Sequence, residues 1–163
     1  MTSSAATTIR PANANDVPLI LELIKALAEF EKLSHEVVAT EEKLRATLFG
    51  AKPSAEVLIC EQDGKGAGFA LFFTNYSTFL ARPGIYLEDL FIKPEIRSQG
   101  LGKKMLVELA KIAVARGCGR LEWSVLDWNT RARKFYEELG AKPMEEWTVH
   151  RVTGEALNAL ANS

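Results

Sequence analysis

The sequence predicts a single mixed α/β domain over residues 1–163, and three observations support that prediction. The chain is long enough for one buried core and short for two. Segments with apolar residues at three- and four-residue steps alternate with short runs rich in β-branched and aromatic residues. The resulting order, β, α, α, β, β, β, α, β, α, β, α, excludes a pure helical bundle and a pure sandwich. The polar stretch at 1–7 is expected to be flexible.

The first half of the chain is predicted to contain a short strand at 7–10, two helices and a hairpin. Leu19, Leu23 and Leu27 recur on one face of the first helix. The second helix, at 40–49, starts with Thr40 as its N-cap and has two glutamates in its first turn, where the helix dipole favours them. The runs "EVLICEQ" and "GAGFALFFTNY" flank "DGKG" and predict the hairpin.

The second half is predicted to alternate strands and helices. The expected elements are a strand at 85–92, a loop at 93–99, a helix from about Gly100 to 116, a strand at 120–125, a helix at 129–139, a strand at 146–152 and a helix at 153–161.

Composition excludes several classes of function. The formal net charge is −1 and 25% of the residues are charged, so no basic excess indicates nucleic acid binding. No run is long and apolar enough to predict a membrane span. Cys60 and Cys118 stand apart from any ligand motif, which predicts free thiols in a reducing cytoplasm. His35 and His150 lack partners at ligand spacing, so no metal is expected.

The stretch "FIKPEIRSQGLGKKML" joins the predicted strand at 85–92 to the next helix through two closely spaced glycines. A helix N-terminus exposes unpaired N–H groups and partial positive charge, and glycine lets a phosphate approach them. The spacing fits neither the P-loop nor the dinucleotide fingerprint. Two interpretations remain: a pyrophosphate site, or a loop that needs glycine for a tight turn.

A family resemblance favours the pyrophosphate site. "RSQGLG" resembles the Arg/Gln-x-x-Gly-x-Gly/Ala acetyl-coenzyme A signature of the GNAT N-acetyltransferases, and "DWNTRARKFYEELGA" resembles the segment that follows it there. "IRPANANDVPLILELIKALAEFEKL", "YLEDLFIKPEIRSQGLG" and "EWTVHR" resemble the spermidine/spermine acetyltransferase branch. The resemblance covers nearly the whole chain after residue 8. It implies the GNAT fold, a twisted, mixed and mostly antiparallel sheet flanked by helices.

The resemblance also implies roles for individual residues. Acetyl-CoA would be held by a strand, a loop and a later helix start, namely Leu90, Phe91, Ile92, Arg97, Ser98, Gln99, Gly100, Leu101, Gly102, Lys103, Asn129, Thr130, Arg131, Ala132 and Tyr136. Asn129 also has the simpler interpretation of an N-cap. Tyr136 matches a tyrosine near the coenzyme sulfur, where a phenol can protonate a leaving thiolate. The alternative for Tyr136, and the preferred interpretation for its neighbour Phe135, is a core aromatic residue.

The acceptor side is indicated by Glu88 and Asp89, two adjacent carboxylates in an apolar strand. Alternation along the strand predicts that they point to opposite faces, so at least one lies near the core or a cleft. They could belong to an edge strand or an ion pair, or they could bind a cationic amine. The resemblance makes Glu88 the residue that binds the amine and helps to remove its proton. It places Phe30, Glu31, Glu88, Asp89, Glu122, Trp123, Ser124, Glu145 and Glu146 along the substrate channel.

The expected function is direct transfer of an acetyl group from acetyl-CoA to a primary amine of a small cationic molecule, a diamine or polyamine, by a homodimeric cytoplasmic enzyme without a metal. One alternative is an acetyltransferase for thialysine or another small amine. Another, of a different class, is a non-catalytic acyl-CoA sensor. An intact Tyr136 and Glu88 argue against the sensor.

Overall fold

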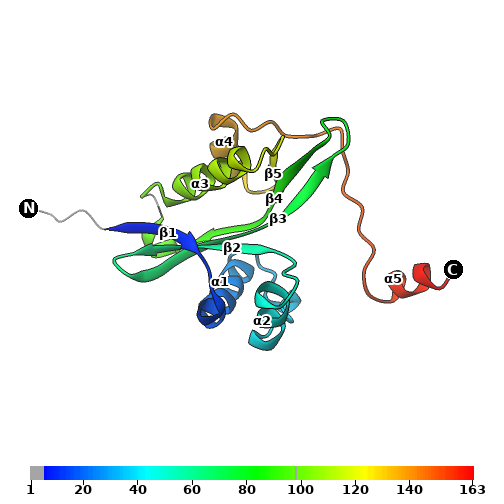
Figure 1. Ribbon diagram of the computed structural model, residues 1–163, viewed down its shortest axis with the longest axis horizontal. Coiled ribbons are helices and arrows are strands. Elements are labelled where there is room, and N and C mark those ends of the chain that lie inside the picture. The colour runs from blue at the N-terminus through cyan, green and yellow to red at the C-terminus, as the bar shows by residue number, and fades with distance from the viewer. Residues whose placement is uncertain (1–5, 98) are drawn as a thin grey trace, which may run out of the picture. The chain divides into compact units, whose positions relative to one another are not determined.

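The computed structural model describes residues 6–97 and 99–163, which form two compact units, one ending at Ser124 and the other starting at Val125. The first unit contains a five-stranded sheet in the order β1-β2-β3-β4-β5 (Figure 1). Neighbouring strands are antiparallel except β4 and β5, which are parallel. The strands are β1 (Thr7–Pro11), β2 (Glu56–Gln62), β3 (Lys65–Ser77), β4 (Arg82–Ile92) and β5 (Leu121–Trp123). The sheet therefore confirms the predicted mixed, mostly antiparallel class.

Helices cover both faces of this sheet (Figure 1). On one face, α1 (Val17–Phe30) and α2 (Glu41–Phe49) bury an apolar cluster against β2, β3 and β4 that includes Ile20, Leu44, Ile59 and Phe69. On the opposite face lies α3 (Leu101–Ala115), whose buried stripe follows the predicted helical period. Three short 3-10 helices connect these elements: η1 (Ala14–Asp16), η2 (Ser34–Glu36) and η3 (Pro94–Ile96).

Local sequence explains where these elements begin and turn. The Thr40 side chain accepts a hydrogen bond from the Lys43 N–H, so it is the predicted N-cap of α2. The β2–β3 hairpin turns through Asp63 and Gly64, both at positive φ (52° and 77°), as a two-residue turn between twisted strands requires.

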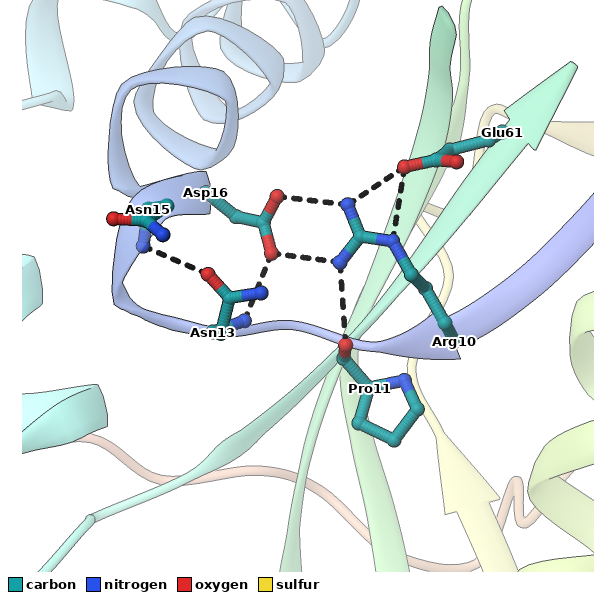
Figure 2. Close-up of polar contacts among 6 residues, drawn as sticks. All are labelled: Arg10, Pro11, Asn13, Asn15, Asp16 and Glu61. Carbon is teal, nitrogen blue, oxygen red and sulfur yellow. Dashed lines mark hydrogen bonds and ion pairs between the residues drawn. The ribbon is translucent and has the colours of Figure 1, made fainter. Parts of the chain in front are cut away.

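An ion-pair network fastens β1 and β2 to the start of α1, as Figure 2 shows. The Arg10 guanidinium donates to both Asp16 oxygens (2.8 and 2.9 Å) and to Glu61 Oε1 from Nε (2.9 Å) and Nη2 (2.6 Å). Asp16 also accepts from the Asn13 N–H (2.8 Å), which closes a capping box. The Arg10 hydrogen bonds hold the pKa of Asp16 below its ordinary value. This network is structural.

The second unit contains α4 (Thr130–Glu138) and α5 (Gly154–Ala161), close to their predicted positions. The prediction of a strand at 146–152 is wrong for this structure, where those described residues form no strand. Trp147 and Val149 alternate with polar residues as predicted, but their side chains are 76% and 79% exposed. Alternation specifies which side chains share a face, whereas a strand also needs a partner for its N–H and C=O groups.

Candidate active site

The edge of β4 opens halfway along the strand. Parallel pairing with β5 joins Ile85 to Leu121, Tyr86 to Glu122 and Leu87 to Trp123. Among the described residues no strand pairs with β4 on that side beyond Leu87. The backbone of 88–92 therefore presents N–H and C=O groups that an extended ligand can pair with.

A β-bulge lies at the point where this pairing ends. On the β3 side, Phe72 pairs with Leu87 and Leu71 pairs with Asp89, so Glu88 is the extra residue. The bulge interrupts the pleat, so Leu87 and Asp89, which simple alternation would place on one face, pair with adjacent β3 residues that point to opposite faces. Asp89 lies opposite Leu71, which packs on the α1 and α2 cluster, so Asp89 belongs to that face. Glu88 is exposed, whereas Asp89 is half-buried.

The charges of two carboxylates, Glu88 and Glu31, act on Asp89 at this bulge. Burial, together with the charges of Glu88 and Glu31, raises the pKa of Asp89 to about 6. Burial also raises the pKa of Glu31, the residue that follows α1. A cation placed here would relieve both the burial cost and the mutual repulsion of these groups.

The loop after β4 leads to an open helix N-terminus. Gly100 has φ 72°, in the left-handed region that favours glycine, and its carbonyl accepts the first helical hydrogen bond, from Lys104 N–H (3.1 Å). The N–H groups of the first turn, at Leu101, Gly102 and Lys103, have no hydrogen-bond acceptor within the helix. A Cβ at Gly100 or Gly102 would meet no atom of the described residues within 4 Å. The space in front of the helix is therefore open, as a phosphate site requires.

The other predicted coenzyme residues of the first unit surround this loop. Phe91 and Ile92 are buried, and Leu90 is half-buried. Gln99 accepts a hydrogen bond from Gln62, which links the loop to β2. Ser98 lies outside the described residues. A depression of about 610 Å³ beside Gly100 is lined by Lys103, Lys104 and Lys111 and also by Glu108, which pairs with Lys111 (2.9 Å).

The Arg97 side chain turns back from this loop toward the sheet. Its Nε donates to the Ile92 carbonyl (2.9 Å), and its guanidinium carbon lies 4.6 Å from the Phe30 ring centroid and 5.3 Å from that of Phe91. The predicted substrate residue Phe30 and the predicted coenzyme residue Arg97 are therefore in direct contact.

At β5 the structure reveals partners that sequence reasoning missed. Glu122 Oε1 accepts from Arg120 Nε (2.7 Å) and from Asn75 Nδ2 (3.1 Å), and the Tyr86 and Ser124 hydroxyls are 2.8 Å apart. The charge of Glu122 is therefore already paired within the protein, whereas a carboxylate that binds a cationic substrate would have its charge unpaired before the substrate binds. Neither Asn75 nor Tyr86 carried a sequence signal, since both read as ordinary strand residues. Trp123 is half-buried.

The second unit holds the remaining candidates. Asn129 is an N-cap, because its side chain accepts from the Ala132 N–H (3.2 Å), while Thr130 and Arg131 are exposed in the first turn of α4. Burial raises the pKa of the Tyr136 phenol, so the hydroxyl stays protonated at neutral pH. Phe135 is half-buried, with its ring centroid 5.6 Å from that of Tyr136. Glu145 Oε1 lies 4.0 Å from Arg133 Nη2, and Glu146 is exposed.

Comparison with known proteins identifies the family. Residues 22–141 match the family model described as "Acetyltransferase (GNAT) family". The chain belongs to the GNAT acetyltransferases. This family transfers an acetyl group from acetyl-CoA, so the chain is identified as an acetyl-CoA-dependent N-acetyltransferase.

Relatives include a thialysine N-epsilon-acetyltransferase from Bos taurus (43% identical over 94% of this chain and 96% of the relative). An L-ornithine N5-acetyltransferase from Arabidopsis thaliana is 38% identical over 93% of this chain and 86% of the relative. A spermidine/spermine N(1)-acetyltransferase-like protein from Homo sapiens is 32% identical over 94% of this chain and 23% of the relative. These matches confirm the predicted branch.

A solved integron cassette protein from the mobile metagenome of V. cholerae has the same fold. It superposes with a TM-score of 0.82 at 25% identity, over 98% of this chain and all of that one.

Two further properties concern the described residues alone. None of their helices has the length and apolar character needed to cross a bilayer. They contain no cluster of three or more His, Cys, Asp or Glu side chains arranged to bind a metal ion.

Proposed function

We propose that this enzyme acetylates a primary amine at one end of a short, cationic molecule. The observation that carries the proposal is a set of three carboxylates beside the open edge of β4: Glu31, Glu88 and Asp89. A half-buried carboxylate near two other negative charges favours a cationic ligand over a neutral one. Within this class a diamine or polyamine fits best, because a second positive charge would interact with the remaining carboxylates.

A second candidate is an amino acid with an aminoalkyl side chain. The relatives at 43% and 38% identity are named for thialysine and ornithine, which supports this class. Such an acceptor carries its own carboxylate, which a wholly acidic channel repels. The ion pair between Arg120 and Glu122 (2.7 Å) neutralises one carboxylate near β5, which would moderate this repulsion.

The donor would be held along β4 and at the start of α3. The open backbone of 88–92 suits the amide groups of a pantetheine arm, and the N–H groups of Leu101, Gly102 and Lys103 suit a pyrophosphate. The depression beside Gly100 would accommodate further phosphate and nucleotide. Asn129, Thr130, Arg131 and Ala132 are proposed as additional contacts from the second unit.

The proposed proton transfers need an acceptor and a donor. An alkyl ammonium group has a pKa near 10.4, so the amine must lose a proton before it attacks the acetyl carbonyl. Glu88 would receive that proton, directly or through water, while Asp89 balances the charge of the bound cation. The Tyr136 phenol, which burial keeps protonated, would donate to the departing thiolate.

A homodimer is proposed as the working assembly, in a reducing cytoplasm. Support comes from apolar side chains exposed on the second unit, among them Trp147 (76%), Val149 (79%) and Leu160 (63%), since solvent-exposed apolar groups of this size favour association. Light scattering at enzyme-assay concentration tests this point, and a monomer would contradict it.

The decisive experiment measures thiol release from acetyl-CoA with putrescine, spermidine, thialysine and a simple monoamine under one condition. We expect turnover with diamines above that with the monoamine, and erosion of this preference by added salt, because exposed charge pairs are screened. Best turnover with thialysine would favour the second candidate. Saturable acetyl-CoA binding without thiol release from any amine would favour a sensor.

Tyr136→Phe tests the proposed acid. The variant keeps the ring and loses only the hydroxyl, so kcat should fall by about 10²-fold while the melting temperature stays close to that of the parent. Phe135→Leu, at the neighbouring ring, is the matched control and should leave kcat nearly unchanged. An unaltered rate in Tyr136→Phe would assign the tyrosine to packing.

A further inference from the structure

The contact between Arg97 and Phe30 joins two parts of the site that the sequence places far apart. Arg97 opens the glycine loop, directly after η3. Phe30 is the last residue of α1, and Glu31 follows it as the helix C-cap. The Arg97 guanidinium carbon lies 4.6 Å from the Phe30 ring centroid, within the range of a cation–π contact.

The Arg97 side chain is held from two other directions. Its Nε donates to the Ile92 carbonyl at the end of β4, and the Phe91 ring centroid lies 5.3 Å from the guanidinium carbon. Phe91 is only 3% exposed and belongs to the core, whereas the Phe30 side chain is 42% exposed. Arg97 therefore fixes the more exposed ring against the buried one.

The chain turns sharply at the end of α1, directly after Phe30 and Glu31. Lys32 has a positive φ of 60°, which is uncommon for a residue other than glycine, and the Leu33 N–H reaches back to the Ala28 carbonyl. Glu31 sits between Phe30 and this turn, and its charge contributes to the raised pKa of Asp89. A shift of Phe30 would thus change where Glu31 lies relative to Asp89.

We propose that Arg97 is a positioning residue whose contact with Phe30, the clip, anchors the end of α1 to the coenzyme loop. Through this contact the loop determines the position of Glu31 in the acceptor site. This proposal deepens the proposed function and rests on it for the identity of the acceptor. It differs from the role that the family resemblance implies, in which Arg97 serves the coenzyme alone. A consequence is that coenzyme binding at the loop steadies the acceptor side through one side chain.

A double-mutant cycle tests the clip. Arg97→Met keeps the apolar stem and removes the guanidinium, and Phe30→Leu keeps apolar bulk and removes the ring. Each should raise the KM for the amine by about two- to fivefold, with kcat little changed. The double variant should raise it no further than either single variant, because both remove the same contact.

Matched controls separate the clip from general effects. Phe49→Leu removes the ring that ends α2, as Phe30→Leu does for α1, and should leave the KM for the amine unchanged. Arg97→Lys keeps the charge but loses the flat guanidinium and its Nε hydrogen bond, so it should behave like Arg97→Met. Three outcomes would each overturn the proposal. The increases in the KM for the amine could multiply in the double variant, or only the KM for acetyl-CoA could rise. Arg97→Lys could also behave like the wild type.

Hydrogen–deuterium exchange supplies a readout that needs no acetyl transfer. In the ligand-free enzyme, amides at 28–33 should exchange faster in Arg97→Met and in Phe30→Leu than in the wild type, whereas Phe49→Leu should affect the end of α2 instead. Unchanged exchange at 28–33 would refute the clip even if the enzyme acetylates amines. Faster exchange combined with no turnover in the wild type would refute the proposed function and leave the clip in place.

Discussion

The two halves of β4 differ in what lies beside them. Residues 82–87 pair with β3 and, from Ile85 onward, with β5 as well, and Ile85 is fully buried. Residues 88–92 begin at the bulge residue Glu88, and among the described strands residues 89–92 pair with β3 alone; this half carries the carboxylates Glu88 and Asp89. One strand thus provides a closed scaffold and an open site, and the bulge at Glu88 marks the boundary.

The difference indicates how this fold reconciles stability with chemistry. A carboxylate at a buried position of the closed half, such as that of Ile85, would bear a high cost of burial. In the open half, Asp89 bears that cost in part, as its raised pKa shows, and a cationic ligand can offset it. Substitutions on the two sides of the boundary should therefore have different consequences.

The largest effect is expected from Glu88→Gln in the open half. Removing the proposed proton acceptor should lower kcat by about 10²–10⁴-fold, with little change in melting temperature because Glu88 is exposed. The loss should shrink at high pH, where more of the amine is already neutral. Steady-state kinetics across pH measures both. Glu41→Gln, at an exposed glutamate of α2, is the control, and equal rates for Glu88→Gln and wild type would remove Glu88 from the mechanism.

In the closed half, Ile85→Ala should affect stability and spare the chemistry. Truncating a fully buried isoleucine costs about 2–5 kcal/mol of unfolding free energy, measurable by urea titration. The kcat of the folded fraction should stay close to that of the wild type. A large loss of kcat in fully folded Ile85→Ala would show that the boundary at Glu88 does not separate scaffold from site.

Asp89→Asn should have two effects of opposite sign. Loss of the charge should raise the KM for the amine by about 10–100-fold, as for removal of a charged hydrogen-bond partner. It should also stabilise the fold above pH 6, because the folded-state pKa of Asp89 is raised and the ionised form is therefore the disfavoured one in the folded protein. The gain should amount to about 1–3 kcal/mol at pH 8 and vanish below pH 4.

The pH dependence of the wild type follows from the same pKa. The KM for the amine should rise as the pH falls through about 6, where Asp89 becomes protonated, and Asp89→Asn should be flat over that range. Kinetics and thermal melting between pH 5 and 8 measure these outcomes. A variant less stable than the wild type at pH 8 would show that Asp89 is satisfied by the protein itself.

Sequence reasoning identified the elements of this site better than their contacts. The hairpin, α1, α2 and α3 followed from periodicity and caps, and the glycine loop from a motif, because each of these signals is local. The bulge at Glu88 depends on the register between β3 and β4, which alternation within one strand does not encode. The contacts of Arg97 with Phe30 and of Glu122 with Asn75 join residues 67 and 47 positions apart. Tertiary packing determines such contacts, and local sequence patterns do not encode them.

The smallest effect, and the most closely controlled, concerns the two glycines that bound α3. Gly100 (φ 72°) and Gly117 (φ 69°) are both left-handed, and in the part of the chain that the structure describes no atom lies within 4 Å of a Cβ built at either. Valine at each position should therefore cost a similar backbone strain of about 1–2 kcal/mol. Only Gly100 borders the helix N-terminus where the pyrophosphate is proposed to bind.

Gly100→Val should consequently raise the KM for acetyl-CoA by about tenfold or more, the equivalent of one phosphate hydrogen bond, whereas Gly117→Val should leave it unchanged. Parallel melting curves establish that the two variants are equally strained, so that any difference in coenzyme affinity belongs to the site. Equal KM values for acetyl-CoA in the two variants would mean that Gly100 serves the turn alone, and the open half of β4 would then have to hold the coenzyme without the loop that follows it.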